Sequence, residues 1–491
     1  MYGIVFTGFA KDNPSTGRST GGYRIATHVR KLGWDIEVID YVSYWNLTNI
    51  KKLVSNRNKK HAIKWIGISI TWNLYEPIVK NIIDYFKKHH PEVIVIVGGN
   101  QNFNLDLNAD YYVYGFGERA VEAILKYEFS NGQKPSGVPC YKGWAINALH
   151  FYPAWPMDDY SVEYEDRDFL AEDDVLTLEL SRGCKFKCKF CEFPVLGVKE
   201  DTSVSEEIMY RDLKDVYDKW GIKNYIIADE TINERDEKII KLGNAVNRVG
   251  FEPNFTGFIR LDLFNANRHQ IELLARARIW GHFYGVETLN HRAGKTIGKG
   301  LDPEKNKQLM LDTKNYMLST LGYYRGTASF IAGLPYETKN DIENTHQWLR
   351  SNWQDQHWHF WPLLIPKTTN YRLSAFGEDF SKYGYRELTL DELNVYKKTH
   401  EDVYTGFLTK PQVLWKNDEG DFFEFSEMAE RLDSINGEEP SKIGNFTVWA
   451  LMSLGLSPEE AMSETSHYDH TKYKKIKNHK IFSYIEKKLS L

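Results

Sequence analysis

The chain has 491 residues, a net charge of −5, 42% hydrophobic and 26% charged residues. This length predicts two or three domains, and the composition is that of a folded protein rather than a disordered one. The acidic balance gives no general attraction for nucleic acid, no apolar run approaches the ~20 residues of a membrane span, and four cysteines form no disulfide framework. Clustered thiols and the lack of a signal peptide in MYGIVFTGFAKDN predict a cytoplasmic protein.

Residues 1–135 alternate short apolar runs with amphipathic helices. Strands are expected at Ile4–Phe6, Ile36–Ile39, Trp65–Ile70, Val93–Val97 and Tyr111–Tyr114. One helix is expected from about Gly22 to Gly33, and another follows Pro77, with Ile78, Ile82 and Phe86 at helical spacing. The alternation predicts an α/β domain with a Rossmann-like open parallel sheet.

Residues 136–173 are loop-like and acidic, and we interpret them as a linker. A second alternation follows over residues 174–375. Its expected strands are Val175–Leu180, Tyr225–Ala228, Phe255–Arg260, His282–Glu287, Gly326–Ile331 and His357–Leu364. Their spacing of about 30–45 residues is typical of a full or partial (β/α) barrel.

Residues 376–491 are expected to be a mainly helical domain. Ser457, Pro458 and Glu460 form a capping-box pattern at the start of one helix. The last residues, TKYKKIKNHKIFSYIEKKLSL, are rich in lysine. We interpret them as a solvated helix or frayed tail, with binding of an acidic partner as the alternative.

Three of the four cysteines, Cys184, Cys188 and Cys191, directly follow the apolar run VLTLEL. Active sites of (β/α) barrels lie at the carboxyl ends of their strands. Three thiolates there could bind three irons of a 4Fe–4S cluster and leave the fourth iron open to a substrate or cofactor. A structural zinc site is the alternative, but it needs a fourth ligand, and no histidine lies between His150 and His269 while Cys140 is distant.

The segment RGCKFKCKFC resembles the C-x3-C-x-aromatic-C signature of the radical S-adenosylmethionine (SAM) enzymes, and the resemblance extends over roughly residues 170–370. It implies that SAM chelates the open iron and that an electron, which an external donor must provide, splits SAM to a 5′-deoxyadenosyl radical. It also implies that Phe190 lies beside the adenine.

The other strand ends carry groups that suit SAM. Asp229 and Glu230 are acceptors for an ammonium group, and Arg260 could hold a carboxylate with two hydrogen bonds. The same resemblance implies further SAM contacts: Asp229 or Glu230 to the amino group, Arg260 to the carboxylate, Glu287 to the ribose hydroxyls, and Gly333 and Pro335 to the adenine. Tyr336 replaces the family's usual glycine, so a left-handed backbone is not expected there. Each charged group alone could instead form a salt bridge at the barrel rim.

The last barrel strand places His357 and His359 on one face. Two histidines that face a barrel interior could do acid–base or ligand work. Histidines that are hydrogen-bonded within the structure are the alternative.

The N-terminal domain lacks the G-x-G-x-x-G pattern of a dinucleotide site. It resembles instead the cobalamin-binding domain that precedes many radical SAM barrels. The matching residues, implied to line a slot for the nucleotide tail, are Ser69, Thr71, Gly98, Gly99, Gly115, Gly117 and Glu118. The loop after the first strand contains no histidine to ligate cobalt, and His28 in the next helix is expected at the surface. A scaffold without cobalamin is the alternative.

The combined resemblance implies a cobalamin-dependent methyltransferase that acts on an unactivated carbon of a small-molecule or peptide substrate. One SAM would methylate cob(I)alamin and a second would generate the radical that activates the substrate. The absence of three further N-terminal cysteines disfavours a methylthiotransferase. The alternatives are a cobalamin-free radical SAM oxidase, cyclase or rearrangement enzyme, and a non-catalytic protein with a metal knuckle.

Overall fold

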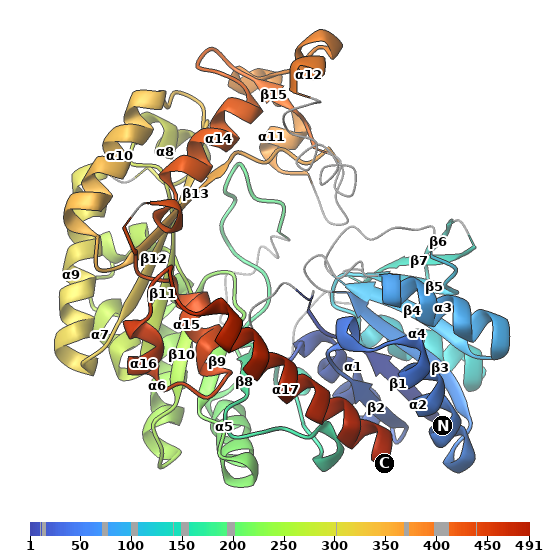
Figure 1. Cartoon of the computed structure of the whole chain (residues 1–491). Helices are drawn as coiled ribbons and strands as arrows, with labels where there is room; N and C mark the ends of the chain where they lie inside the picture. Colours follow the sequence, from blue (N-terminus) through green and yellow to red (C-terminus); the bar gives the residue numbers. More distant parts are fainter. Residues whose placement is uncertain are drawn as a thin grey trace. The chain divides into compact units, whose positions relative to one another are not determined.

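The computed structural model describes residues 1–9, 11, 16–70, 77–99, 107–140, 142–148, 157–193, 202–300, 302–367, 373–396, 412–437 and 439–491 (Figure 1). They form two compact units. The N-terminal unit comprises residues 1–177, 211–222 and 470–491, and the barrel unit comprises residues 178–210 and 223–469. This division differs from the four expected segments, because residues 376–469 group with the barrel and residues 470–491 group with the N-terminal sheet. None of the described helices is both long and apolar enough to cross a membrane.

The N-terminal unit contains a seven-stranded sheet in the order β2-β1-β3-β4-β5-β7-β6. The strands are β1 (Tyr2–Phe6), β2 (Asp35–Ile39), β3 (Ile63–Ile70), β4 (Ile94–Gly99), β5 (Tyr111–Tyr114), β6 (Val138–Cys140) and β7 (Gly143–Asn147). All five predicted strands are confirmed, and the order 2-1-3-4-5 is that of a doubly wound fold. The linker prediction misses β6 and β7, whose Gly- and Pro-containing sequence hides their strand character.

Helices α1 (Thr20–Lys31), α2 (Leu47–Lys60), α3 (Pro77–His89) and α4 (Glu118–Phe129) connect these strands. The predicted apolar face of α3 is confirmed, because Ile78, Ile82 and Phe86 are buried. Helix α1 begins two residues before the expected start at Gly22. His28 in α1 is only partly exposed, and its Nε2 lies 2.8 Å from Glu122 Oε2, so it is not the free surface residue that the sequence suggests.

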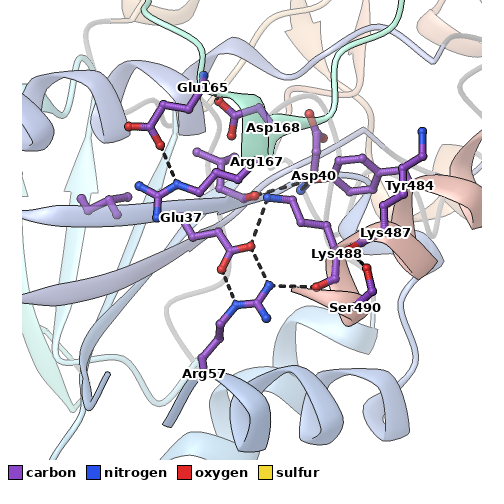
Figure 2. A network of polar contacts seen from close by, with 12 residues as sticks. Glu37, Asp40, Arg57, Glu165, Arg167, Asp168, Tyr484, Lys487, Lys488 and Ser490 are labelled. Atoms are coloured by element: carbon purple, nitrogen blue, oxygen red, sulfur yellow. Dashed lines mark hydrogen bonds and ion pairs between the residues drawn. The ribbon is translucent and has the colours of Figure 1, made fainter. Parts of the chain in front are cut away.

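Helix α17 (His470–Ser490) is part of the N-terminal unit; it has a solvated face, as expected, but it is not frayed, because its other face is buried. Figure 2 shows how its end is held: Lys488 Nζ lies 3.1 Å from Glu37 Oε1, and Arg57 binds the same carboxylate at 2.7 and 2.9 Å. Tyr484 Oη accepts a hydrogen bond from Asp40 N at 2.9 Å. The lysine-rich pattern therefore contains buried cations as well as exposed ones.

The barrel unit is a partial (β/α) barrel with the strand order β13-β12-β11-β10-β9-β8. The strands are β8 (Val175–Leu178), β9 (Asn224–Ile227), β10 (Asn254–Ile259), β11 (Ile279–Glu287), β12 (Arg325–Ala332) and β13 (His357–Pro362). The boundary between the two units falls within β8. All six predicted strands are confirmed, and the strand pairs β9–β10, β10–β11, β11–β12 and β12–β13 are parallel.

Helices α6 (Asp236–Arg248), α7 (Gln270–Arg276), α9 (Pro303–Leu321) and α10 (Lys339–Asn352) follow the strands of this sheet, while α5 (Glu206–Trp220) crosses the unit boundary. Further helices are α8 (His291–Ile297), α11 (Ala375–Glu378), α12 (Leu390–Tyr396), α14 (Phe422–Leu432), α15 (Asn445–Met452) and α16 (Pro458–Ser463), and β14 (Arg386–Glu387) pairs with β15 (Trp415–Lys416). The capping box of Ser457 and Glu460 is confirmed. Helix α15 meets the sheet from inside, where Asn445 Nδ2 donates to Thr256 Oγ1 at 2.7 Å.

Candidate cluster and SAM site

The three clustered cysteines lie on the loop that follows β8. All three side chains are partly exposed, and none of them forms a disulfide bond. Two backbone hydrogen bonds hold the middle of the loop, from Lys189 N to Ile297 O at 3.1 Å and from Phe376 N to Lys189 O at 3.3 Å. The loop is thus attached to the end of α8 and the start of α11, and it presents its thiols at the carboxyl end of the strands.

A buried ion pair supports the start of this loop. Asp229, at the end of β9, accepts hydrogen bonds from Leu180 N at 2.8 Å, from Ser181 N at 3.1 Å and from Lys238 Nζ at 2.7 Å. Lys238 also donates to Thr231 O at 2.9 Å. Thr231 Oγ1 in turn lies 3.7 Å from Cys184 Sγ. Because its acceptor sites are taken by the loop, Asp229 is a structural residue here rather than an available ligand for SAM.

Glu230, the neighbour of Asp229, has the opposite character. Its Oε2 is buried and has no hydrogen-bond partner among the described residues. Burial, followed by the negative charges of Asp229 and Glu179, raises the pKa of Glu230 to about 7. An unpaired buried carboxylate is costly unless a cation or donor binds to it. Of the two acidic candidates at this strand end, Glu230 is therefore the one that can receive an ammonium group.

Arg260 follows β10 and is 8% exposed. Its Nε and Nη2 donate to the two carboxylate oxygens of Asp262 at 2.8 and 2.9 Å, and Nη2 also donates to Gly298 O at 2.7 Å. The remaining Nη1 lies 3.5 Å from Cys188 Sγ. The forked face that the sequence assigned to a SAM carboxylate is thus occupied by Asp262, and the free nitrogen points at a candidate cluster ligand.

Glu287 ends β11 in a left-handed backbone conformation, with φ of 70°. A non-glycine residue in this region is strained by roughly 1–3 kcal/mol, and such strain concentrates at functional sites. The side chain is 8% exposed, and its Oε1 lies 2.8 Å from Lys299 Nζ. Lys299 also donates to Gly285 O at 2.5 Å and lies 5.9 Å from the centre of the Phe190 ring. The structure therefore places a buried cation beside Glu287 and Phe190.

The turn after β12 corrects one expectation. Tyr336 adopts a left-handed backbone with φ of 66°, although it replaces a glycine. The side chain is 54% exposed and lies over the guanidinium of Arg292 at 3.8 Å, so no packing opposes this conformation. Position 333 requires glycine for a steric reason, because a Cβ there would lie 2.4 Å from Trp415. Pro335 is buried in the same turn.

Glu337, which follows this turn, is a second buried carboxyl group. Thr288 Oγ1 donates to its Oε1, and its Oε2 has no hydrogen-bond partner among the described residues. Burial raises the pKa of Glu337 to about 8, so this group is largely protonated at neutral pH. It is a possible donor at the edge of the site.

Residues 178–349 match the model of the Radical SAM superfamily. This chain carries a radical SAM domain. A methyltransferase of Pyrococcus horikoshii that is itself uncharacterised is 25% identical over 361 residues, which cover 67% of this chain and 72% of the relative.

Solved structures share the fold. The radical SAM methyltransferase TsrM from Kitasatospora setae, solved with a tryptophan substrate and a SAM analogue, has a TM-score of 0.60 at 11% identity and covers 79% of each chain. The cobalamin-dependent radical SAM enzyme OxsB has a TM-score of 0.52 at 16% identity, over 77% of this chain and 55% of that one. At these identities the solved structures share the fold of this chain, and the family match identifies residues 178–349 as a radical SAM domain.

The thiols of the radical SAM domain suit a cluster better than a single ion. No three His, Cys, Asp or Glu side chains of the described residues are grouped to hold one metal ion. In a 4Fe–4S cluster each cysteine binds a different iron, so the thiols need not converge on one point. Three cysteines on one short loop, with no fourth nearby in sequence, match a cluster that keeps an open iron.

Sequence reasoning missed Lys238 and Lys299 of the radical SAM domain. Lys238 is 1% exposed and lies within α6, and Lys299 lies in the loop after α8. Neither residue directly follows a strand, where a (β/α) barrel is expected to carry its functional groups. A lysine in the otherwise apolar buried face of α6 was the signal that could have revealed Lys238.

The predicted cobalamin residues lie at the carboxyl ends of β3, β4 and β5, except for Thr71, which lies outside the described residues. Gly99 is required by the chain itself, since a Cβ there would lie 1.9 Å from Ile70 O. At Gly98 a Cβ would only reach ordinary contact, 3.5 Å from Val113 O, so packing does not explain this glycine. Ser69 faces α1, because a Cβ on Gly21 would lie 2.6 Å from its Oγ.

The remaining residues that the sequence predicts to bind cobalamin lie at the start of α4. Gly115 has φ of 93°, Gly117 caps α4, and Glu118 is buried in the first turn of that helix. Gly117 also lies close to α1, because a Cβ on Gly117 would lie 3.3 Å from Ile25 Cδ1. These residues form a small-residue edge on the sheet, where doubly wound folds bind their ligands.

Proposed function

We propose that this protein is a cobalamin-dependent radical SAM methyltransferase that modifies an unactivated carbon. What carries the proposal is the unpaired buried oxygen of Glu230 beside a loop with three clustered cysteines. The proposal that the chain binds cobalamin is supported by its N-terminal sheet, which has the strand order 2-1-3-4-5 and carries glycines at the carboxyl ends of its strands. The structural relatives named as cobalamin-dependent or methyltransferases support it further.

The chain's residues divide the work of holding SAM. Glu230 would bind the amino group, because an ammonium satisfies the buried oxygen and restores the charged state of the carboxylate. Lys299 would attract the SAM carboxylate, and Glu287, which it positions, would accept hydrogen bonds from the ribose hydroxyls. Phe190 would contact the adenine, with Gly333 and Pro335 shaping the turn opposite.

When bound, the cluster and SAM supply a 5′-deoxyadenosyl radical, and cobalamin supplies the methyl transfer. The task of the chain is to position these groups and to exclude water. Cys184, Cys188 and Cys191 would hold the cluster, and Arg260 places positive charge beside Cys188. An external electron donor and a small-molecule or peptide substrate complete the proposed reaction. Four cysteines without a disulfide bond suit a reducing cytoplasm.

For cobalamin, the exposed backbone at Gly98 and the edge at Gly115 and Gly117 would face the nucleotide tail. The loop after β1 has no histidine in its sequence, so an imidazole from that loop would not ligate cobalt. The EPR spectrum of cob(II)alamin bound to the chain should therefore lack splitting from a histidine nitrogen of that loop.

Anaerobic reconstitution of the full chain tests the proposal. We expect about four irons and four sulfides per chain, an EPR spectrum that changes on adding SAM, and formation of 5′-deoxyadenosine on reduction. We also expect one cobalamin to bind at micromolar concentration. A cluster that is insensitive to SAM contradicts the enzyme assignment. SAM cleavage without cobalamin binding contradicts only the cobalamin part and favours a scaffold role for the N-terminal sheet.

A further inference from the structure

The inward-facing residues of the barrel follow from the strand register. Phe258 of β10 pairs with Phe283 of β11, and Phe283 pairs with Thr327 of β12. One layer further along the strands, Gly285 pairs with Ser329, and Ser329 pairs with His359 of β13. Paired residues of parallel strands point to the same face of a sheet. Ser329 and His359 therefore continue the layer that begins at Gly285, next to the Glu287–Lys299 pair.

Aromatic rings line this inner face in a continuous chain. The ring centres of Phe258 and Phe283 are 5.0 Å apart, those of Phe283 and His359 are 5.3 Å apart, and those of His359 and Trp361 are 5.6 Å apart. Phe446 of α15 joins the chain, 5.3 Å from Phe283. All of these distances are typical of interacting aromatic pairs.

The inner rings are accessible, whereas the outer face of the same strands is not. Phe258, Phe283, His359 and Phe446 are partly exposed, and Trp361 is 59% exposed. On the outer face, by contrast, Phe255 and Tyr284 are fully buried beneath the helices. An exposed tryptophan at a strand end inside a barrel is unusual for a purely structural residue.

Charge is distributed unevenly over the inner face near the strand ends. The charged groups Glu230, Arg260, Glu287 and Lys299 belong to β9–β11 and the loops that follow them. Beyond Arg325 at the start of β12, the corresponding residues of β12 and β13 are uncharged: Thr327, Ser329, Ile331, His357, His359 and Trp361. Glu337, which follows β12, is largely protonated. Burial lowers the pKa of His359 to about 4, so its imidazole is neutral at physiological pH.

Within this uncharged half, His359 has one engaged and one available nitrogen. Nε2 lies 2.9 Å from Ser329 Oγ, which fixes the ring. Nδ1 has no hydrogen bond to another described residue, so it is available to a ligand. His357, one layer below, is instead held by Ser434 Oγ at 2.8 Å and is buried against Gly444 at the start of α15.

We propose that the inner face formed by Phe283, Ser329, His359 and Trp361 binds an uncharged aromatic ring of the substrate, with His359 Nδ1 as its hydrogen-bonding partner. The ring would stack on Trp361 and His359, one strand away from the SAM-binding residues. This inference deepens the proposed function and rests on it, because Gly285 and Ser329 are what connect this face to the SAM site.

Three small probes of similar size test the chemistry on the reconstituted full chain. Phenol is neutral and aromatic, cyclohexanol keeps the hydroxyl without the ring, and benzoate keeps the ring with a negative charge. Binding is followed by saturation-transfer NMR titration, which detects weak ligands. We expect phenol to bind at least about tenfold more tightly than the other two, since stacking and a hydrogen bond each contribute to its affinity.

Variants assign the binding to this face. Trp361→Ala and His359→Ala should each weaken phenol binding about three- to tenfold, the range for one stacked ring or one hydrogen bond. His269→Ala, which changes an exposed histidine outside the barrel, is the matched control and should bind phenol like the wild type. Because Trp361 is exposed, its replacement removes little core packing and keeps the test valid even if His359→Ala folds poorly.

Two results overturn the inference. The first is that benzoate or cyclohexanol binds as tightly as phenol, and the second is that Trp361→Ala binds phenol as tightly as the wild type. Neither result affects the proposed function, which is measured separately as SAM cleavage by the wild type. Conversely, probe binding requires no electron and no radical. A chain that binds phenol as expected but never cleaves SAM would contradict the proposed function and leave the aromatic site standing as a binding site.

Discussion

Arg260 Nη1 lies 3.5 Å from Cys188 Sγ, while Nε and Nη2 of the same guanidinium are held by both oxygens of Asp262. The group also stacks over the Phe186 ring at 4.0 Å. It is thus fixed on three sides, with its charge next to a candidate cluster ligand. An N–H donor and a positive charge beside a cysteine sulfur favour the reduced form of an iron–sulfur cluster.

Arg260→Gln should therefore lower the reduction potential of the cluster. We expect the ratio of reduced to oxidised cluster at a fixed potential to fall about tenfold, equivalent to ~59 mV for one electron. An EPR-monitored redox titration measures this directly. Arg248→Gln, which removes a surface arginine paired with Glu206 and Glu207, serves as the control and should leave the potential unchanged. An unchanged potential in Arg260→Gln would mean that the guanidinium only holds the loop.

Replacing any one of Cys184, Cys188 or Cys191 by alanine should abolish SAM cleavage, because each thiolate binds one iron. The fold should persist, since all three side chains are partly exposed and lie on a loop. Cys140→Ala is the matched control, as this residue ends β6 in the N-terminal unit. Iron and sulfide analysis with far-UV circular dichroism checks both expectations. Loss of iron in Cys140→Ala would identify a fourth ligand and refute the open iron.

The affinity for SAM should depend on pH through Glu230. Burial raises the pKa of its carboxyl to about 7, so the carboxylate that pairs with an ammonium is lost as the pH falls below this value. Affinity should then fall by up to about tenfold per pH unit on the acid side. On the alkaline side the SAM amino group itself deprotonates, near its usual pKa of ~8.

Isothermal titration calorimetry between pH 5.5 and 8.5 measures this profile. Glu230→Gln should bind SAM more weakly and lose the acid limb of the profile. Glu272→Gln, an exposed position on α7, should keep the wild-type profile. An acid limb that persists in Glu230→Gln would assign the titration to another group.

Gly98→Leu should release cobalamin, because the branched side chain would extend beyond a Cβ that already lies 3.5 Å from Val113 O, into the space proposed for the nucleotide tail. Gly98→Ala is the graded control: its Cβ would make ordinary contacts, so it should fold and retain most of the cofactor. Ser69→Leu should act in the same direction. The visible absorption of bound cobalamin after gel filtration gives the readout. Full retention by Gly98→Leu would place the cofactor elsewhere.

Lys488→Ala should destabilise the N-terminal unit by about 3–5 kcal/mol, the usual cost of removing one member of a buried ion pair. The adjacent Lys487 is exposed, and Lys487→Ala should change the free energy of unfolding by less than about 0.5 kcal/mol. Urea titration compares the two variants. Equal stability of both would show that Arg57 and Tyr2 satisfy Glu37 without Lys488.

The same cluster predicts acid sensitivity of the N-terminal unit. Burial acts to raise the pKa of Glu37, but the hydrogen bond from Arg57 and the charge of Lys488 outweigh it and lower the pKa to about 2. A carboxyl group whose pKa is lowered by folding stabilises the fold above its unfolded value of 4.5. That contribution is lost as the pH falls from 4.5 toward 2, and Glu37→Gln should reduce this loss, as acid titration of the unfolding free energy would measure.

The sequence was sufficient for the eleven principal strands and the cysteine loop, because apolar runs and motif spacing are local properties. It could not separate Asp229 from Glu230. The two are adjacent and chemically alike, and only the approach of Ser181 and Lys238 from elsewhere in the fold satisfies one and not the other. For Arg260 the position at a strand end was predicted, but Asp262 as its partner was not.

The prediction for the lysine-rich C-terminal segment was incomplete for a related reason. Lysines at helical spacing indicate a solvated face, and most of them are indeed exposed. Lys477 and Lys488 are buried because carbonyl or carboxylate oxygens of the N-terminal residues meet them, among them Lys11 O and Glu37. A partner more than 400 positions away leaves no trace in a local pattern.

The pairing of Glu37 with Lys488 across 451 positions also has a consequence during synthesis. At about 5–20 residues per second, a ribosome needs roughly 20–90 s to make Lys488 after Glu37 has emerged. Throughout that interval the Glu37 carboxylate of β2 has Arg57 and Tyr2 as partners but not Lys488, and the surface that α17 will cover stays open. The first sheet to leave the ribosome is thus among the last to be completed, and during that time it presents apolar surface that chaperones would recognise.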